Sequence, residues 1–226
     1  MGSEDGFSGD GIKLTELSGT VKQNMDYIFN KTVEMDGADL SQAHKEHLKG
    51  IVDNFKHILE LASSDVKIDT EFYKSLDEKE NTRGDANPKT GRIKLTLGNQ
   101  KNNTMTEVAV HEVQHVMIRA AIKADKRLEY EILKLREAVR EHLVKKYGGQ
   151  PWRVFLEGKA KDKIDEHDAK KKYEYAFNNR LYPADEFIAY ATTHEPLVNA
   201  LGIMKNVDMG KGLFGKVKET GKWTKL

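Results

Sequence analysis

The chain has 226 residues, 38% of them hydrophobic and 32% charged, which is enough to bury one sizeable core. Its formal net charge of +1 gives no overall field that would favour nucleic acid or an anionic membrane, and the lack of cysteine excludes disulfides and thiolate zinc sites. No apolar run approaches the roughly 18 residues of a membrane span, and residues 1–11 lack the apolar core of a signal peptide, so we expect a cytoplasmic protein.

The N-terminal part is predicted to be helical after a flexible acidic tail over residues 1–12. Apolar residues recur at helical spacing in two stretches, which predicts two helices within residues 13–62. His44 and His47 lie three positions apart on the second of these helices and can reach one ion, but they stand among charged residues. A solvated helix face is therefore the better interpretation of this pair.

A short stretch of strands is predicted next. Apolar and polar residues alternate over residues 64–76, which predicts one or two strands, and they alternate again over residues 91–97, which predicts a half-buried strand. Between them, residues 77–90 are polar and contain the turn sequence Asp-Ala-Asn-Pro, which predicts a loop.

The helix predicted over residues 104–124 has a strong start signal and a mostly apolar surface. Thr104 and Glu107 have the spacing of a capping box, in which each satisfies a backbone N–H at the helix start. Valine, isoleucine, methionine and alanine dominate the rest of the stretch. We therefore expect this helix to be buried on most sides and to lie at the centre of the fold.

Inside this helix lies the sequence His-Glu-Val-Gln-His. His111 and His115 are four positions apart, so both imidazoles project from one helix face and can bind one small cation. Zn²⁺ accepts such ligands, and a catalytic zinc site leaves one position open for water. Glu112 projects beside the pair and can take a proton from that water. The motif predicts a metal, a nucleophile and a general base.

The segment after this helix is rich in charge. An amphipathic helix is predicted from Asp125 to about residue 147, where two glycines end it. Residues 157–180 carry many lysines, but acidic residues interrupt the basic run, so a solvated helix is a better interpretation than a nucleic-acid interface.

A third metal ligand is predicted on a helix near residue 186. Two histidines alone hold zinc poorly, and Asp185 and Glu186 begin an apolar helix after Pro183. We favour Glu186 as the ligand, with Asp185 as the alternative; acidic residues also suit a helix start without any metal. A last core helix is predicted over 197–205.

The predicted fold class is α+β and mostly helical, with a central metal-binding helix and a small mixed or antiparallel sheet. We expect one domain over residues 13–206, in which residues 64–206 hold the sheet and the catalytic core. Residues 207–226 are rich in glycine and lysine and are predicted to form a basic C-terminal appendage.

These elements resemble a known family. A strand (GRIKLTL), a polar loop, a helix with HEVQH, a long insertion and a helix with DEFIAYA resemble the zincin-like metallopeptidases whose third ligand is a glutamate. The likeness covers about residues 64–205 and is greatest to the peptidase domains of phage polyvalent proteins. It implies a zincin-like fold and a zinc peptidase for protein or peptide substrates, with His111, His115 and Glu186 as ligands and Glu112 as base. It also implies a protein that enters bacteria with phage or plasmid DNA, is virion-associated or acts in the host cytoplasm, and contacts other virion proteins.

Supporting roles are assigned to residues near these motifs. Tyr182, Tyr190 and His194 are candidate donors to the oxyanion, although core packing or capping also accounts for each. Asp185 is a candidate to orient a ligating histidine from outside the ligand set. The strand over residues 91–97 is a candidate to pair with an extended substrate, although ordinary sheet membership explains its alternation equally well.

Two other functions compete with the peptidase. The first is a non-catalytic virion or ejected protein that keeps the zincin fold, and Glu112 counts against it because a purely structural site has no use for a base. The second is a nucleic-acid-binding helical protein, against which the near-neutral charge counts.

Overall fold

The computed structural model describes residues 11–36, 42–61, 66–76, 82–98, 104–157, 165–181, 183–194 and 197. The described residues form six α-helices and one four-stranded sheet, so the mostly helical α+β class is confirmed. The helices are α1 (Val21–Asp36), α2 (Gln42–Leu61), α3 (Met105–Ala124), α4 (Arg127–Lys146), α5 (Glu166–Asn178) and α6 (Pro183–Thr193), with a 3₁₀ helix η1 (Pro151–Leu156). The predicted appendage and nearly all of the predicted last core helix lie outside the described residues.

The sheet is mixed, with the strand order β1-β2-β4-β3. β1 (Gly11–Thr20) is antiparallel to β2 (Lys67–Ser75), β2 is parallel to β4 (Arg92–Leu97), and β3 (Arg83–Asn87) is antiparallel to β4. β3 therefore forms an edge of the sheet, and β4 lies inside it. The prediction that the strand over 91–97 binds substrate along a free edge is wrong, because both of its sides are already paired.

Two strands differ from the sequence prediction. The expected first helix begins only at Val21, and residues 11–20 form β1. A bulge between Lys13 and Thr15 breaks the alternation of β1 and leaves Leu14 46% exposed, so the apolar spacing imitates that of a helix. β3 lies in the predicted loop over 77–90; the residues that alternate with its charged ones are only glycine and alanine, too small to signal a strand.

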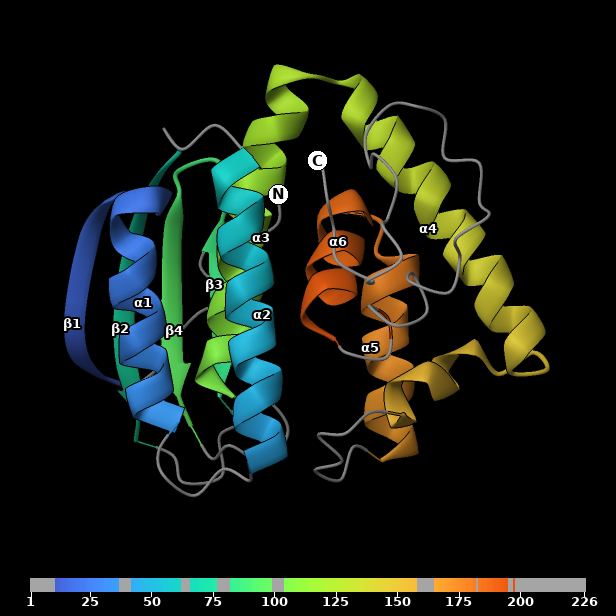
Figure 1. The fold of residues 1–226 in the computed structure, drawn as a ribbon, viewed down its shortest axis with the longest axis horizontal. Coiled ribbons are helices and arrows are strands. Elements are labelled where there is room, and N and C mark those ends of the chain that lie inside the picture. Colours follow the sequence, from blue (N-terminus) through green and yellow to red (C-terminus); the bar gives the residue numbers. More distant parts are fainter. Residues whose placement is uncertain are drawn as a thin grey trace.

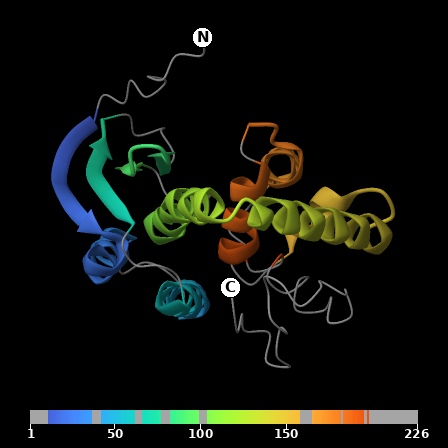
Figure 2. The same cartoon turned by 90° about the horizontal axis from the view of Figure 1, so that it is seen from above.

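α3 connects two hydrophobic cores. Figure 1 shows the sheet with α1 and α2 on one side of the molecule and α4, α5 and α6 on the other, with α3 between them. The first part of α3, through Met117, packs with the sheet, α1 and α2 in what we call the sheet core. From Ile118 onward α3 packs with α4, η1, α5 and α6 in the helical core. Figure 2 shows α3 from above, passing from the strands to α6.

The start of α3 is capped from two sides. The capping box of Thr104 and Glu107 is present as predicted. Asp36, the last residue of α1, is a second cap: its carboxylate accepts from the backbone N–H groups of Met105 and Thr106, the latter at 2.9 Å, and from the Thr106 hydroxyl at 2.6 Å. Asp36 is only 4% exposed, and burial raises the pKa of its carboxyl against the opposing effect of these hydrogen bonds. It therefore joins the end of α1 to the start of α3.

Replacing Asp36 should destabilise the protein. Asp36→Ala removes one acceptor group from three buried donors, so we expect the free energy of unfolding to fall by about 2–3 kcal/mol. Urea denaturation measures this loss. Asp53→Ala, at an exposed position on α2, is the matched control and should change stability by less than about 0.5 kcal/mol. Equal effects of the two substitutions would contradict the role of Asp36 as a cap.

No helix in the described part of the chain is long and apolar enough to cross a membrane.

Candidate metal centre

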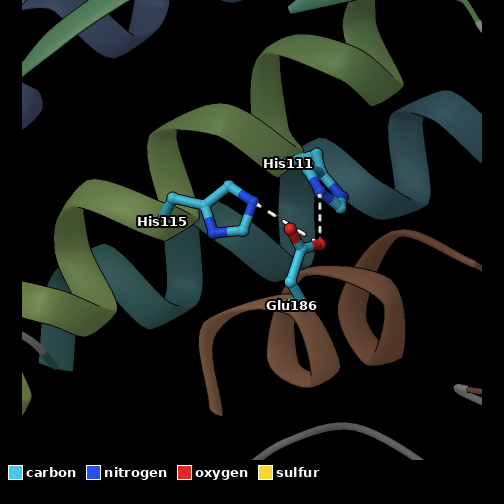
Figure 3. A group of neighbouring side chains, drawn as sticks. All are labelled: His111, His115 and Glu186. Carbon is cyan, nitrogen blue, oxygen red and sulfur yellow. Dashed lines mark ion pairs between the residues drawn. The ribbon is translucent and has the colours of Figure 1, made fainter. Parts of the chain in front are cut away.

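Two histidines and one glutamate converge where α3 crosses α6. His111 and His115 lie on the same face of α3, and Glu186 reaches them from the first turn of α6 (Figure 3). Glu186 Oε2 is 3.5 Å from His111 Nε2 and 3.8 Å from His115 Nε2, and one candidate ligand atom from each residue lies within 4.8 Å of the others. The three residues can hold a metal ion.

The two distances from Glu186 to the histidines suit a small tetrahedral cation. Zinc bonds to nitrogen and oxygen are about 2.0–2.2 Å long, so two tetrahedral ligands are about 3.4 Å apart. The two distances from Glu186 to the histidines are close to that value. Two imidazoles and a carboxylate form a donor set that zinc prefers, although other divalent metals accept it as well.

The surroundings keep His115 in the form that binds metal. His115 is buried, and desolvation lowers its pKa well below the usual range, with the nearby His111 and Arg119 acting in the same direction. Neutral imidazole is the ligating form. His111 and Glu186 keep side-chain exposures of 18% and 16%, so the group is not sealed from solvent.

Glu112 lies between the metal ligands and the edge strand. A Cβ atom built on Gly84 of β3 would be 2.4 Å from Glu112 Cγ, 2.9 Å from its Cδ and 2.7 Å from Val108 Cγ1. The backbone of β3 therefore passes directly over the Glu112 side chain, and only glycine leaves room for it. Burial raises the pKa of Glu112 to about 7; Glu186 and Asp85 add to this rise and His111 opposes it.

The raised pKa predicts how the stability of the metal-free protein depends on pH. A carboxyl whose pKa is higher in the folded state holds its proton more tightly there, so stability falls as pH rises from the unfolded to the folded pKa. We expect metal-free wild type to lose up to about 3 kcal/mol between pH 4.5 and 7, relative to Glu112→Gln. Urea denaturation of wild type and Glu112→Gln at each pH gives the difference in their free energies of unfolding. The contribution of His115 is present in both proteins and therefore cancels in this difference. Parallel stability curves would contradict the raised pKa.

The two predicted oxyanion donors that the structure describes, Tyr190 and His194, pack against different rings. The Tyr190 ring lies 4.9 Å from the His111 ring, centroid to centroid, and burial raises the pKa of its phenol, so it keeps its proton at neutral pH. His194 packs its ring at 4.6 Å against Phe155. Tyr182 lies outside the described residues. Of the two donors that the structure describes, Tyr190 is the one whose ring packs against His111, a candidate metal ligand.

Asp185 contacts an arginine and not, as predicted, a ligating histidine. It is fully buried, and one of its carboxylate oxygens accepts a hydrogen bond from Arg119 Nε, whereas the other has no hydrogen-bond partner. It therefore hydrogen-bonds neither histidine directly, and Glu186 is the carboxylate that faces them. Burial raises the pKa of Asp185 to about 6 against the opposing charge of Arg119.

The contributions of Gly84 and Arg119 to this site were not predicted from the sequence. Nothing in the sequence indicated a role for Gly84, because the strand that carries it has no apolar pattern. Arg119 had a signal, since it is a single charge in the apolar run from Val116 to Ile122 and a buried charge needs a partner.

Comparison of the chain with family models, with curated proteins and with solved structures gave no match. The fold and the site together define a class: an α+β protein whose central helix supplies two histidines, and a later helix one glutamate, to a candidate metal centre.

Proposed function

We propose that this protein is a zinc-dependent metallopeptidase with a zincin-like fold. The observation that carries the proposal is the convergence of His111, His115 and Glu186, with Glu112 beside them under an edge strand. A bound zinc ion would supply Lewis-acid polarisation of the scissile carbonyl and a lowered pKa for water. The residues of the chain supply the remaining functions.

Glu112 acts as the general base in this proposal. It is in the same helical turn as His111, and its raised pKa makes it a good proton acceptor near neutral pH. Its carboxylate takes the proton from the attacking water and later delivers it to the leaving amine. A non-catalytic metal site would gain nothing from a carboxylate held in this position.

β3 is the proposed substrate-binding strand. It is a terminal strand of the sheet, and in the part of the chain that the structure describes no strand pairs with its outer edge. An extended peptide that adds to this edge would pass the Glu112 carboxylate, because Gly84 lies directly against that side chain. This proposal implies an extended segment of a protein or peptide as the substrate.

Tyr190 is the proposed donor to the developing oxyanion. Its phenol keeps its proton at neutral pH, and its ring packs against His111. A donor that is held by packing before the reaction stabilises developing charge without reorganisation. The phage association, the virion partners and the host location remain expectations from the resemblance alone.

Hydrolysis of an unfolded protein in H₂¹⁸O tests the proposed function. Zinc-loaded wild type should cleave the substrate and place one ¹⁸O in each new carboxyl group, as peptide mass spectrometry detects. A chelator should remove the cleavage, and added zinc should restore it. No cleavage by the zinc-loaded protein, or cleavage that the chelator leaves unchanged, would contradict the proposal.

A further inference from the structure

The helix segments that carry Glu186 and His111 pack in different hydrophobic cores. His111 lies in the part of α3 that packs in the sheet core, whereas Glu186 lies on α6, whose apolar residues pack in the helical core. The distances of 3.5 and 3.8 Å between Glu186 and the histidines therefore depend on how the two cores are joined. A small movement of α6 would carry Glu186 out of reach of the ion.

Glu186 also lies in the least secured part of its helix. The first turn of any α-helix lacks intrahelical partners for its N–H groups, so this turn frays most easily. Glu186 is the fourth residue of α6, and its Oε1 accepts only a long hydrogen bond, 3.5 Å, from the Asn179 amide. This hydrogen bond comes from the end of α5, so it does not fix the first turn of α6 against α3.

Asp185 and Arg119 supply such a fixed contact. Asp185 is adjacent to Glu186 and accepts a hydrogen bond from Arg119 Nε on α3, one turn beyond His115. Arg119 Nη1 also lies 3.7 Å from Glu129 Oε1 on α4, so this side chain of α3 contacts two other helices, α4 and α6. At the other end of the α3–α6 contact, the Thr192 hydroxyl lies against Gln114 Oε1.

Stability alone does not explain a buried ion pair here. The Asp185 side chain is 0% exposed, and Arg119 only 24%. Desolvation of two charges often cancels their attraction, and apolar residues of similar size stabilise a core equally well. What an ion pair adds is a defined geometry, because the guanidinium donates along fixed directions.

We propose that Arg119 and Asp185 are positioning residues that hold Glu186 in place to bind the metal. This inference rests on the proposed zinc centre. Asp185 lies in the first turn of α6, and its hydrogen bond to Arg119 joins this turn to α3. The bond therefore sets the rotation of the turn and its position along the axis of α6. These two in turn determine the direction in which Glu186 points. Neither residue of the pair needs to contact the ion.

Two alternatives give different results. If Arg119 acted on the metal only through its charge, its removal would raise zinc affinity, since a cation near the site would be lost. If the pair only stabilised the fold, replacing both residues by apolar ones would restore stability and zinc affinity together. The positioning role predicts that affinity falls on loss of Arg119 and is not restored in the double variant.

Zinc affinity and stability are measured together to test this. Competition with a chromophoric chelator gives the zinc Kd, and urea denaturation gives the stability of the metal-free protein, for wild type, Arg119→Leu, Asp185→Leu and the double variant. Each single variant leaves one member of the ion pair without the other and should be less stable; the double variant should recover most of that loss. All three should bind zinc about 10- to 100-fold more weakly than wild type.

Two further variants complete the test. Arg119→Lys keeps the charge, so the fold should persist, but an ammonium cannot reproduce the Nε geometry; we expect about a tenfold loss of zinc affinity. Glu141→Gln, at an exposed position on α4 away from this pair, is the matched control and should bind zinc like wild type. Wild-type affinity in Arg119→Lys or in the double variant would overturn the positioning role alone. A wild type that binds no zinc would overturn the metal centre itself, and this inference with it.

Discussion

Glu112→Gln is expected to abolish peptide hydrolysis while leaving zinc content unchanged. Glutamine has nearly the size and shape of glutamate, so the side chain still fits under β3 beside Gly84. It cannot accept the proton of the attacking water, and the loss of a general base lowers the rate about 10²- to 10⁴-fold. The candidate ligands His111, His115 and Glu186 are untouched, so a bound metal should stay in place.

The measurement is kcat/KM on one peptide substrate, with zinc content determined on the same preparations. Glu141→Gln, at an exposed position on α4, is the matched control and should have wild-type activity. A Glu112→Gln protein that keeps more than a tenth of the wild-type rate would show that another group takes the proton.

Gly84→Ala is expected to have the second-largest effect on catalysis. The new methyl group would lie within 3 Å of two carbon atoms of the Glu112 side chain and of Val108 Cγ1, so the base must move. Misplacement of a catalytic group by about 1 Å can lower the rate about 100-fold. The three atoms nearest to this methyl group belong to Glu112 and Val108 and not to a candidate metal ligand, so zinc should still bind, although overpacking should lower stability by about 1–3 kcal/mol.

Gly50→Ala provides the matched control for this substitution. Gly50 lies in α2, and a Cβ atom added there meets nothing within 4 Å. We expect unchanged activity and a gain of about 0.5–1 kcal/mol in stability, because alanine favours a helix. If Gly84→Ala keeps full activity, β3 does not set the position of Glu112. If it loses zinc as well as activity, the damage extends beyond the base.

The parts of the site that could be predicted are those with a helical spacing or a cap. His111 and His115 face one way because they are four apart on a helix, and the Thr104–Glu107 capping box marks where that helix begins. Glu186 was predicted from the chemistry of zinc, which needs a third ligand, and from the helix that follows Pro183. These signals are local, so the sequence alone contains them.

The parts that could not be predicted depend on contacts between distant segments. Gly84 is a small residue in a strand without large apolar residues, and its role appears only when β3 lies against α3. Asp36 has no local sequence signal as a cap, because that function depends on the approach of α1 to a helix start nearly 70 positions later. Asp185 was expected near a histidine, yet the nearby cation Arg119 binds its carboxylate.

Metal content is the most direct test of the central claim, that His111, His115 and Glu186 form a metal centre. Purified protein is loaded with zinc, dialysed and analysed by inductively coupled plasma mass spectrometry, for wild type, Glu186→Ala and His167→Ala, an exposed histidine on α5 that serves as the control. We expect about one zinc per chain in wild type and in His167→Ala, and little in Glu186→Ala. Wild type without zinc, or Glu186→Ala with as much zinc as wild type, would contradict the three-ligand centre.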